Sequence, residues 1–182
     1  AARRHQLETY FDRTAVDAWA RLTSDAPVGR IRRTVRAGRD EMRATLLSWL
    51  PHDLSGMRIL DAGCGTGHWS VYFGELGFRV AGLDLSPKMI AAARARHAPN
   101  CRFSVGDVMR LPYKDGRFHV ACAITVMEFV PDVQKACEEI MRCLKPGGCM
   151  VVGALNRLAA INRQRVAAGA EPFASAHMFT LD

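Results

Sequence analysis

The chain has 182 residues, of which 49% are hydrophobic and 24% are charged, and its formal net charge is +7. This composition is typical of one globular domain with a core of its own. It contains no run of 18 apolar residues, which excludes a predicted membrane span, and its first residues lack the apolar core of a signal peptide.

Cysteine spacing and charge distribution narrow the class of protein further. The six cysteines form no C-x-x-C pair and mostly lie in apolar runs, so we interpret them as small buried side chains in a reducing cytoplasm and expect no metal site. The positive charge is not gathered into a basic run with interleaved aromatic residues. Nucleic acid is therefore not an expected partner, and an anionic small molecule fits better.

The N-terminal third predicts two helices. Residues 5–24 carry apolar side chains at roughly helical spacing, and a second helix is expected from Val28 to Leu50, where Pro51 ends it. At about 100° per residue, four arginines form a stripe beside the apolar face of the second helix: Arg32, Arg36, Arg39 and Arg43. Such a stripe suits a flat hydrophobic ligand with carboxylates. The alternative is a solvated edge whose arginine stems cover apolar surface.

The stretch from Ile59 to Gly67 predicts a strand, a glycine-rich turn and the start of a helix. An apolar run ends at Asp61, and three glycines follow at alternate positions: Gly63, Gly65 and Gly67. Glycine permits a positive φ and lets a ligand approach closely, and the N–H groups at the start of the helix point at the turn. His68 stands where a dinucleotide-binding turn has its third glycine, and no lysine is near for a phosphate-binding P-loop. A tight turn without a ligand is the alternative.

Two further acids stand at predicted strand ends. Residues 78–84 read as a strand that ends at Asp84, and an acid about 20 residues beyond such a turn can accept both ribose hydroxyls. Ser86 then predicts an N-cap and Pro87 the first position of a helix that continues to His97. Residues 101–105 predict a third strand, followed by Gly106 and Asp107. Each acid alone is explained as well by a cap or a turn.

The second half continues the alternation of strands and helices. A continuous apolar strand is expected at 118–124, a helix from Pro131 to Leu144 that ends at Lys145–Gly148, a fifth strand at 149–154 and a helix at 156–168 that stops at Gly169. This order predicts an α/β fold with a doubly wound, mainly parallel, Rossmann-like sheet. Ligands of such sheets lie beyond the carboxyl ends of the strands, where all three acids are expected.

The pattern from Asp61 to Gly67, with the two later acids, resembles the class I S-adenosylmethionine (SAM) methyltransferases. The resemblance implies that the glycine turn holds the methionine part of SAM near Asp61, that Asp84 binds the ribose and that Asp107 binds the adenine amino group. Leu85 and Val108, which follow these acids, are counted with the cofactor site. Residues 56–182 are then the SAM-binding domain, and residues 1–55 a helical lid on the substrate side.

This family normally closes its sheet with two more strands, for which the sequence has no residues. Either the chain is a fragment, or a partner such as a second copy of the chain covers the sheet edge.

Residues 10–67 resemble one family more closely, the magnesium-protoporphyrin IX O-methyltransferases. The matching segments are 10–15, 19–27, 31–40 and 60–67. The resemblance implies methyl transfer to a porphyrin propionate, with Tyr10 over the substrate and the arginine stripe at the second propionate.

The second half departs from that family. Met127–Glu128–Phe129 replaces its Ile-His-Tyr segment, and residues 130–156 resemble a broad group that includes quinone methyltransferases. A propionate is already ionised near pH 7 and needs no base, whereas a phenol, amine or carbon acceptor needs one. Tyr10, Glu128 and His119 are the candidates for that role, and Glu128 fits a cation contact or an ordinary loop acid as well. A SAM-binding protein without catalysis is a further alternative.

Overall fold

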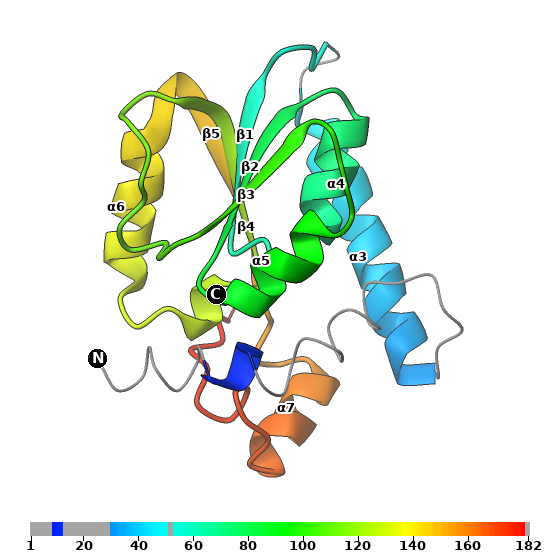
Figure 1. Ribbon diagram of the computed structural model, residues 1–182. Coiled ribbons are helices and arrows are strands. Elements are labelled where there is room, and N and C mark those ends of the chain that lie inside the picture. The colour runs from blue at the N-terminus through cyan, green and yellow to red at the C-terminus, as the bar shows by residue number, and fades with distance from the viewer. Residues whose placement is uncertain (1–8, 13–29, 51–52, 181–182) are drawn as a thin grey trace.

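The chain folds around a five-stranded parallel sheet with helices on both faces (Figure 1). The computed structural model describes residues 9–12, 30–50 and 53–180, with only the backbone described at 30–36 and 39. The strands lie in the order β3-β2-β1-β4-β5. Their bounds are Arg58–Ala62 for β1, Arg79–Asp84 for β2, Cys101–Val105 for β3, Phe118–Ile124 for β4 and Leu144–Gly153 for β5. All pairings are parallel, which confirms the predicted doubly wound α/β fold.

The helices cover the two faces of the sheet and the edge where its strands end. In Figure 1, α3 (Arg30–Ser48), α4 (His68–Glu75) and α5 (Pro87–Arg94) lie to the right of the sheet and α6 (Val133–Cys143) to the left. The short η2 helix (Met127–Phe129) follows β4, and α7 (Ala160–Ala167) lies below the carboxyl ends of the strands. The helical turn at residues 9–12 lies at that same end.

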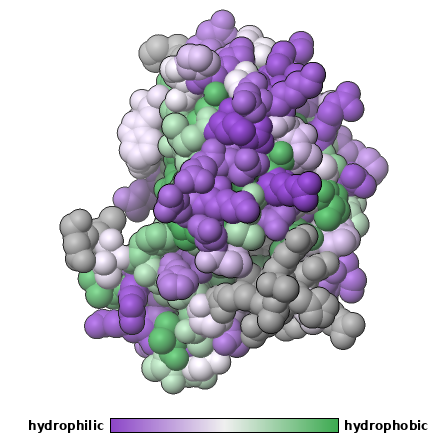
Figure 2. Space-filling model, turned by 90° about the vertical axis from the view of Figure 1, so that its left-hand side faces the viewer, coloured by the Kyte–Doolittle hydropathy of each residue, from purple (hydrophilic) through white to green (hydrophobic). Residues whose placement is uncertain are grey.

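Each central strand contributes to two cores because its side chains alternate between the faces. Leu60 and Ala121 belong to the core on the α6 side, with Ile140 of that helix. Ile59 and Val120, one residue earlier on the same strands, belong to the core that Leu46 of α3 and Phe73 of α4 complete. The outward face of α6 is polar except at Met141, and hydrophilic side chains gather over the upper part of that side of the molecule (Figure 2). A central strand buried on both faces therefore explains the continuous apolar runs in the sequence.

Several predicted boundaries were wrong by a few residues. The α5 helix ends at Arg94 rather than His97, which itself has a φ of 52°. The β5 strand begins at Leu144, directly after α6, whereas the sequence predicted Cys149. The intervening residues 145–148 form an irregularity in the β4–β5 pairing, at which Gly147 takes a φ of 76°. The α7 helix begins at Ala160 rather than at residue 156, and Gly169 follows its end with a φ of 63°.

Other predictions concern residues that are only partly described. Of the helix expected at 5–24, only 9–12 lie among the described residues, and these are helical. The second helix is present as α3, and its expected start at Val28 lies outside the described residues. Residues 53–180 contain the five strands above and no closing pair, so both explanations for the missing strands stay predictions. None of the described helices is both long and apolar enough to cross a membrane.

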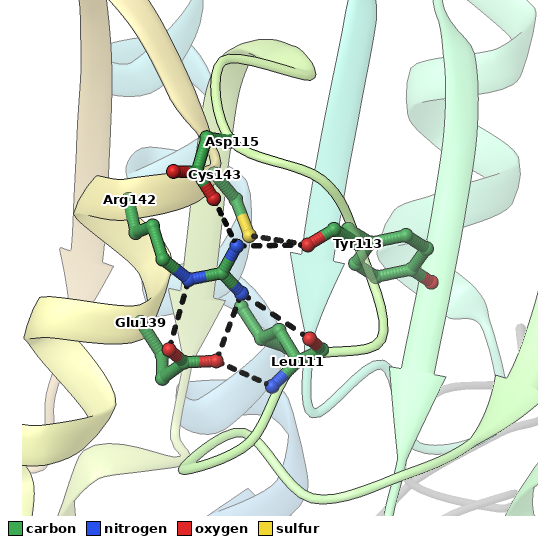
Figure 3. A network of polar contacts seen from close by, with 6 residues as sticks. All are labelled: Leu111, Tyr113, Asp115, Glu139, Arg142 and Cys143. Carbon is green, nitrogen blue, oxygen red and sulfur yellow. Dashed lines mark hydrogen bonds and ion pairs between the residues drawn. The ribbon is translucent and has the colours of Figure 1, made fainter.

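One arginine fastens the link between β3 and β4 to α6 (Figure 3). The Arg142 guanidinium donates to both carboxylate oxygens of Glu139 at 2.9 and 3.0 Å and to Asp115 Oδ1 at 2.6 Å. It also donates to the carbonyl oxygens of Tyr113 at 2.9 Å and Leu111 at 3.2 Å. Glu139 accepts from the Leu111 N–H at 2.8 Å, so the link is held from both sides. The hydrogen bonds from Arg142 lower the pKa of Glu139.

We expect Arg142→Met to lower the free energy of unfolding by about 1 to 3 kcal/mol, because a charged donor to four groups is lost. The measurement is urea unfolding at pH 7. Lys135→Met, on the exposed face of the same helix, is the control and should change stability by less than about 0.5 kcal/mol. Equal losses from both variants would contradict a specific role for Arg142.

Candidate functional site

The three glycines of the turn after β1 have different surroundings. Their φ angles are 78° for Gly63, 52° for Gly65 and 76° for Gly67, a region that disfavours other residues. A Cβ on Gly63 would lie 2.3 Å from a methyl group of Val126, and one on Gly67 would lie 3.0 Å from Ala93 and Phe103. A Cβ on Gly65 would meet nothing within 4 Å. Gly63 and Gly67 thus permit close packing, whereas Gly65 faces open space that a ligand can enter.

The turn is hydrogen-bonded to the end of β2, which brings Asp84 beside Gly65. The N–H groups of Gly63 and Cys64 donate to Leu83 O at 2.7 and 2.9 Å. The Gly65 N–H donates to Asp84 Oδ2 at 2.8 Å, and the Ser86 N–H donates to Oδ1 at 2.9 Å. A carboxylate has about four acceptor positions, so each oxygen of Asp84 retains capacity for a ligand hydroxyl. Burial raises the pKa of Asp84, which these N–H donors partly oppose.

Asp61 lies inside the protein beneath the turn. Its side chain is 2% exposed, accepts from Ser70 Oγ at 2.6 Å and lies 3.7 Å from the Cys122 thiol. Burial raises its pKa from 3.8 to about 6, against the lowering effect of the Ser70 hydroxyl. Burial also raises the pKa of the Cys122 thiol, with a further contribution from Asp61, so this sulfur stays protonated at neutral pH. Asp61 thus anchors the first turn of α4 through Ser70.

The third acid joins the same edge. The Gly106 N–H donates to Asp84 O at 2.9 Å, which brings the segment after β3 against the end of β2. Asp107 Oδ1 accepts from the Met109 N–H at 2.9 Å. Asp107, Val108 and Leu85 are all partly exposed. The structure therefore gathers the acids at the ends of β1, β2 and β3 along one edge, although their roles toward a ligand stay predictions.

The helical turn at 9–12 docks on this edge through contacts that the sequence did not predict. Asp12 accepts from the Ser86 hydroxyl and from the Lys88 N–H, the latter at 3.3 Å, and so caps α5. Phe11 packs edge-on against Phe129 of η2 with ring centroids 5.8 Å apart. Tyr10 packs against Phe11, and burial raises the pKa of its phenol. No spacing rule connects Asp12 with a helix start 74 residues later.

Glu128, expected as a base or a cation contact, is 0% exposed. One carboxylate oxygen accepts from the Leu155 N–H, and its backbone carbonyl accepts from the His177 N–H at 2.7 Å. The other carboxylate oxygen has no hydrogen-bond partner among the described residues. Burial raises the pKa of Glu128. In this structure Glu128 joins η2 to the segments that flank α7.

Two other residues singled out in the sequence lie away from this edge. His119 is the second residue of β4, at the opposite end of the sheet, where Nδ1 accepts from the Arg58 N–H at 2.9 Å and Nε2 lies 2.9 Å from Lys145 Nζ. Burial and the charge of Lys145 lower the pKa of His119. Of the arginine stripe, Arg43 packs over Tyr72 with 4.5 Å to the ring centroid, and it bonds His68. The side chains of the other three lie outside the described residues.

The site therefore offers glycine backbone, carboxylate acceptors and an aromatic surface as its means of recognition. Open space above Gly65 beside the spare acceptor positions of Asp84 fits the ribose of an adenosyl ligand. Within the described part of the chain, no cluster of three or more His, Cys, Asp or Glu side chains could hold a metal ion.

Comparisons with known proteins point to one family. The profile of the family described as "Methyltransferase domain" matches residues 60–152. The magnesium-protoporphyrin O-methyltransferase of Rhodobacter capsulatus is 43% identical over 142 residues, which cover 75% of this chain and 63% of that protein. The demethylmenaquinone methyltransferase of Chlorobaculum parvum is 38% identical over 96 residues, which cover 52% of this chain and 39% of that protein. The chain thus spans less than two thirds of the length of these relatives.

A solved structure shares the fold over most of the chain. The crystal structure of magnesium protoporphyrin IX methyltransferase from Synechocystis PCC 6803 with bound SAH matches with a TM-score of 0.79 at 20% identity. The match covers 97% of this chain and 83% of that one.

The raised pKa of Asp61 predicts how stability depends on pH. A carboxyl whose folded-state pKa lies above its unfolded value stabilises the fold most below the unfolded value, and this contribution is lost as pH rises through the folded pKa of about 6. The wild-type protein should therefore lose about 2 to 3 kcal/mol of unfolding free energy from this group between pH 4 and pH 8. Asp61→Asn cannot ionise and should not show this loss. Urea unfolding of both proteins across this range measures the difference.

Asp53→Asn is the control, because the pKa of Asp53 is shifted in the opposite direction. Hydrogen bonds from Ser55 lower the pKa of the exposed Asp53 carboxyl, so its contribution is present at neutral pH and lost in acid. An Asp61→Asn difference that does not change with pH would contradict the buried, partly protonated state.

Proposed function

Since the chain belongs to the methyltransferase domain family, we propose that it binds SAM and transfers its methyl group to a carboxylate of magnesium-protoporphyrin IX. SAM supplies a methyl group on a positively charged sulfur, which is already activated for displacement. The protein then has to bind both partners, align them and exclude water.

The surroundings of Gly65 and Asp84 carry the proposal for the cofactor. Gly65 leaves the space above its Cα open, and its N–H fixes the Asp84 carboxylate at the border of that space. Asp84 would hold the ribose hydroxyls, with Leu85 beside it, and Asp107 and Val108 would hold the adenine end. Gly63, Gly67 and buried Asp61 would keep the turn in shape on the methionine side.

The relative from Rhodobacter capsulatus supports the acceptor. Its similarity extends over 142 residues, more than the N-terminal segments that suggested this family in the sequence. The positions and protonation of the three candidate bases also favour an acceptor that needs no general base. The carboxyl of Glu128 is buried, His119 lies at the other end of the sheet, and the raised pKa keeps the Tyr10 phenol neutral. A propionate is ionised without help.

A quinone is the second candidate acceptor, because the relative from Chlorobaculum parvum is named a demethylmenaquinone methyltransferase. We further propose that residues 1–55 act as a lid on the substrate side of a SAM-binding domain at 56–182. The free state of all six cysteines supports a reducing cytoplasm. A homo-oligomer stays a prediction.

The cofactor proposal predicts that Gly65→Ala weakens SAH binding at least tenfold, since the added methyl group enters the space assigned to the ligand. Alanine at positive φ also costs about 1 to 2 kcal/mol of stability. Gly116→Ala is a matched control, because Gly116 has a φ of 61° and a Cβ there also meets nothing within 4 Å. Titration calorimetry should find normal SAH affinity in that variant. Equal SAH affinities of the Gly65→Ala and Gly116→Ala variants would refute the assignment of Gly65.

The acceptor proposal predicts labelled methyl ester when the chain is incubated with labelled SAM and magnesium-protoporphyrin IX. Demethylmenaquinol is the parallel substrate. Methylated product from the quinol alone would contradict magnesium-protoporphyrin IX as the acceptor and indicate a quinone instead. SAH binding without product from either substrate would favour a SAM-binding protein that lacks catalysis.

A further inference from the structure

The α7 helix places one guanidinium on the aromatic side chains below the sheet. Arg165 is partly buried, with its guanidinium carbon 4.2 Å from the centroid of the Phe173 ring. Its Nη1 lies 3.4 Å from Asn162 Oδ1, and the buried Asn162 amide in turn donates to Asn156 O at 2.9 Å. Arg165 is thus held by a ring on one side and a fixed amide on the other.

Among the described residues, no carboxylate lies within 4.0 Å of the Arg165 guanidinium. Within residues 9–12, 30–50 and 53–180, the ion pairs within 4.0 Å involve other side chains, Arg43 and Arg142. Burial lowers the pKa of Arg165, and the phenol of Tyr10 is the group that acts on it electrostatically. Guanidinium pKa values are high enough that it stays charged near pH 7. A neutral amide and a ring compensate a partly desolvated cation less than an opposite charge does, and a bound anion would supply that charge.

The rings near Arg165 reach from α7 to the predicted cofactor edge. We name Tyr10, Phe11, Phe129 and Phe173 the aromatic cluster. Consecutive centroids are 5.2, 5.8 and 6.1 Å apart, from Tyr10 through Phe11 and Phe129 to Phe173. Phe129 follows β4, and Asp12, adjacent to Phe11, bonds Ser86 two residues after Asp84. Phe129 is buried, whereas the other three rings of the cluster are partly exposed. An acceptor packed on these three rings would therefore lie beside the adenosyl site with one end at Arg165.

We propose that Arg165 determines acceptor specificity by pairing with a carboxylate of a flat aromatic acceptor whose ring system packs on the partly exposed rings of the aromatic cluster. The assignment rests on the proposed function. An acceptor with two carboxylates would keep one as a charged anchor at Arg165 while the other receives the methyl group. The planar fork of arginine suits a carboxylate in two-point contact and can stack on an aromatic face at the same time.

A purely structural role for Arg165, as a cover over Phe173, makes a different prediction. Its loss would then weaken all acceptors alike, or none, through a change in the aromatic cluster. A direct ion pair instead discriminates between an acceptor with a free carboxylate and the same acceptor with its carboxylates esterified.

The experiment compares binding of magnesium-protoporphyrin IX and of its dimethyl ester, followed by absorbance in the presence of SAH. Arg165→Met, which retains an apolar stem over Phe173, should weaken binding of the free acid about tenfold or more and leave binding of the ester unchanged. Arg165→Lys should fall between Arg165→Met and wild type, because it keeps the charge but loses the fork. Arg163→Met, an exposed arginine on the same helix, should match wild type for both ligands.

Equal losses for acid and ester, or no loss for either, would overturn the assignment of Arg165. Failure of the proposed function is visible separately, as absent SAH binding or absent methyl ester product in the wild-type protein. If the wild-type protein bound neither magnesium-protoporphyrin IX nor its dimethyl ester, both the assignment of Arg165 and the proposed acceptor would be overturned.

Discussion

The hydrogen bonds that fasten the glycine turn to the end of β2 are the constraint on which the candidate site depends. Leu83 O accepts two N–H groups from the turn, and Asp84 accepts a third from Gly65. These bonds fix both the path of the turn and the direction of the carboxylate. The same geometry requires a positive φ at Gly65 and leaves its Cβ position open. The open binding surface and the requirement for glycine are thus two results of one arrangement.

Buried and exposed residues both contact the elements around the glycine turn. Below the turn, buried Asp61 holds Ser70 of α4, and burial shifts its pKa toward neutrality. Above it, Asp12 caps α5 next to Asp84, and its neighbour Phe11 reaches Phe129. The N-terminal turn therefore links the predicted cofactor edge to the aromatic cluster. Methyl transfer needs such proximity, because an activated methyl group requires alignment more than it requires acid–base catalysis.

The parts that sequence predicted well are those with local signals. Apolar runs gave the strands, alternate glycines gave the turn, and Ser86 with Pro87 gave the start of α5, where Met89 N donates to the Ser86 hydroxyl. The predicted start of β5 was wrong because Lys145–Gly148 is typical of the end of a helix. In the structure, β4 pairs with Leu144 before this segment and with Cys149 after it, so the strand begins earlier. Asp12 was missed because its contact with Ser86 spans 74 residues, and Phe173 because its ring packs on the distant Phe129. Arg165 covers a ring only eight residues away, but Phe173 lies beyond the end of α7, so no helical spacing connects the two. Burial of Glu128 was likewise invisible, since its partners come from residues 155 and 177.

The central claim, an adenosyl ligand held between Gly65 and Asp84, is tested most directly by a crystal structure of the protein with SAH. The account predicts electron density for the ribose within hydrogen-bond distance of both Asp84 carboxylate oxygens, over the open side of Gly65, with the adenine toward Asp107. Well-defined SAH density elsewhere on the protein, with this space filled by side chains, would contradict it.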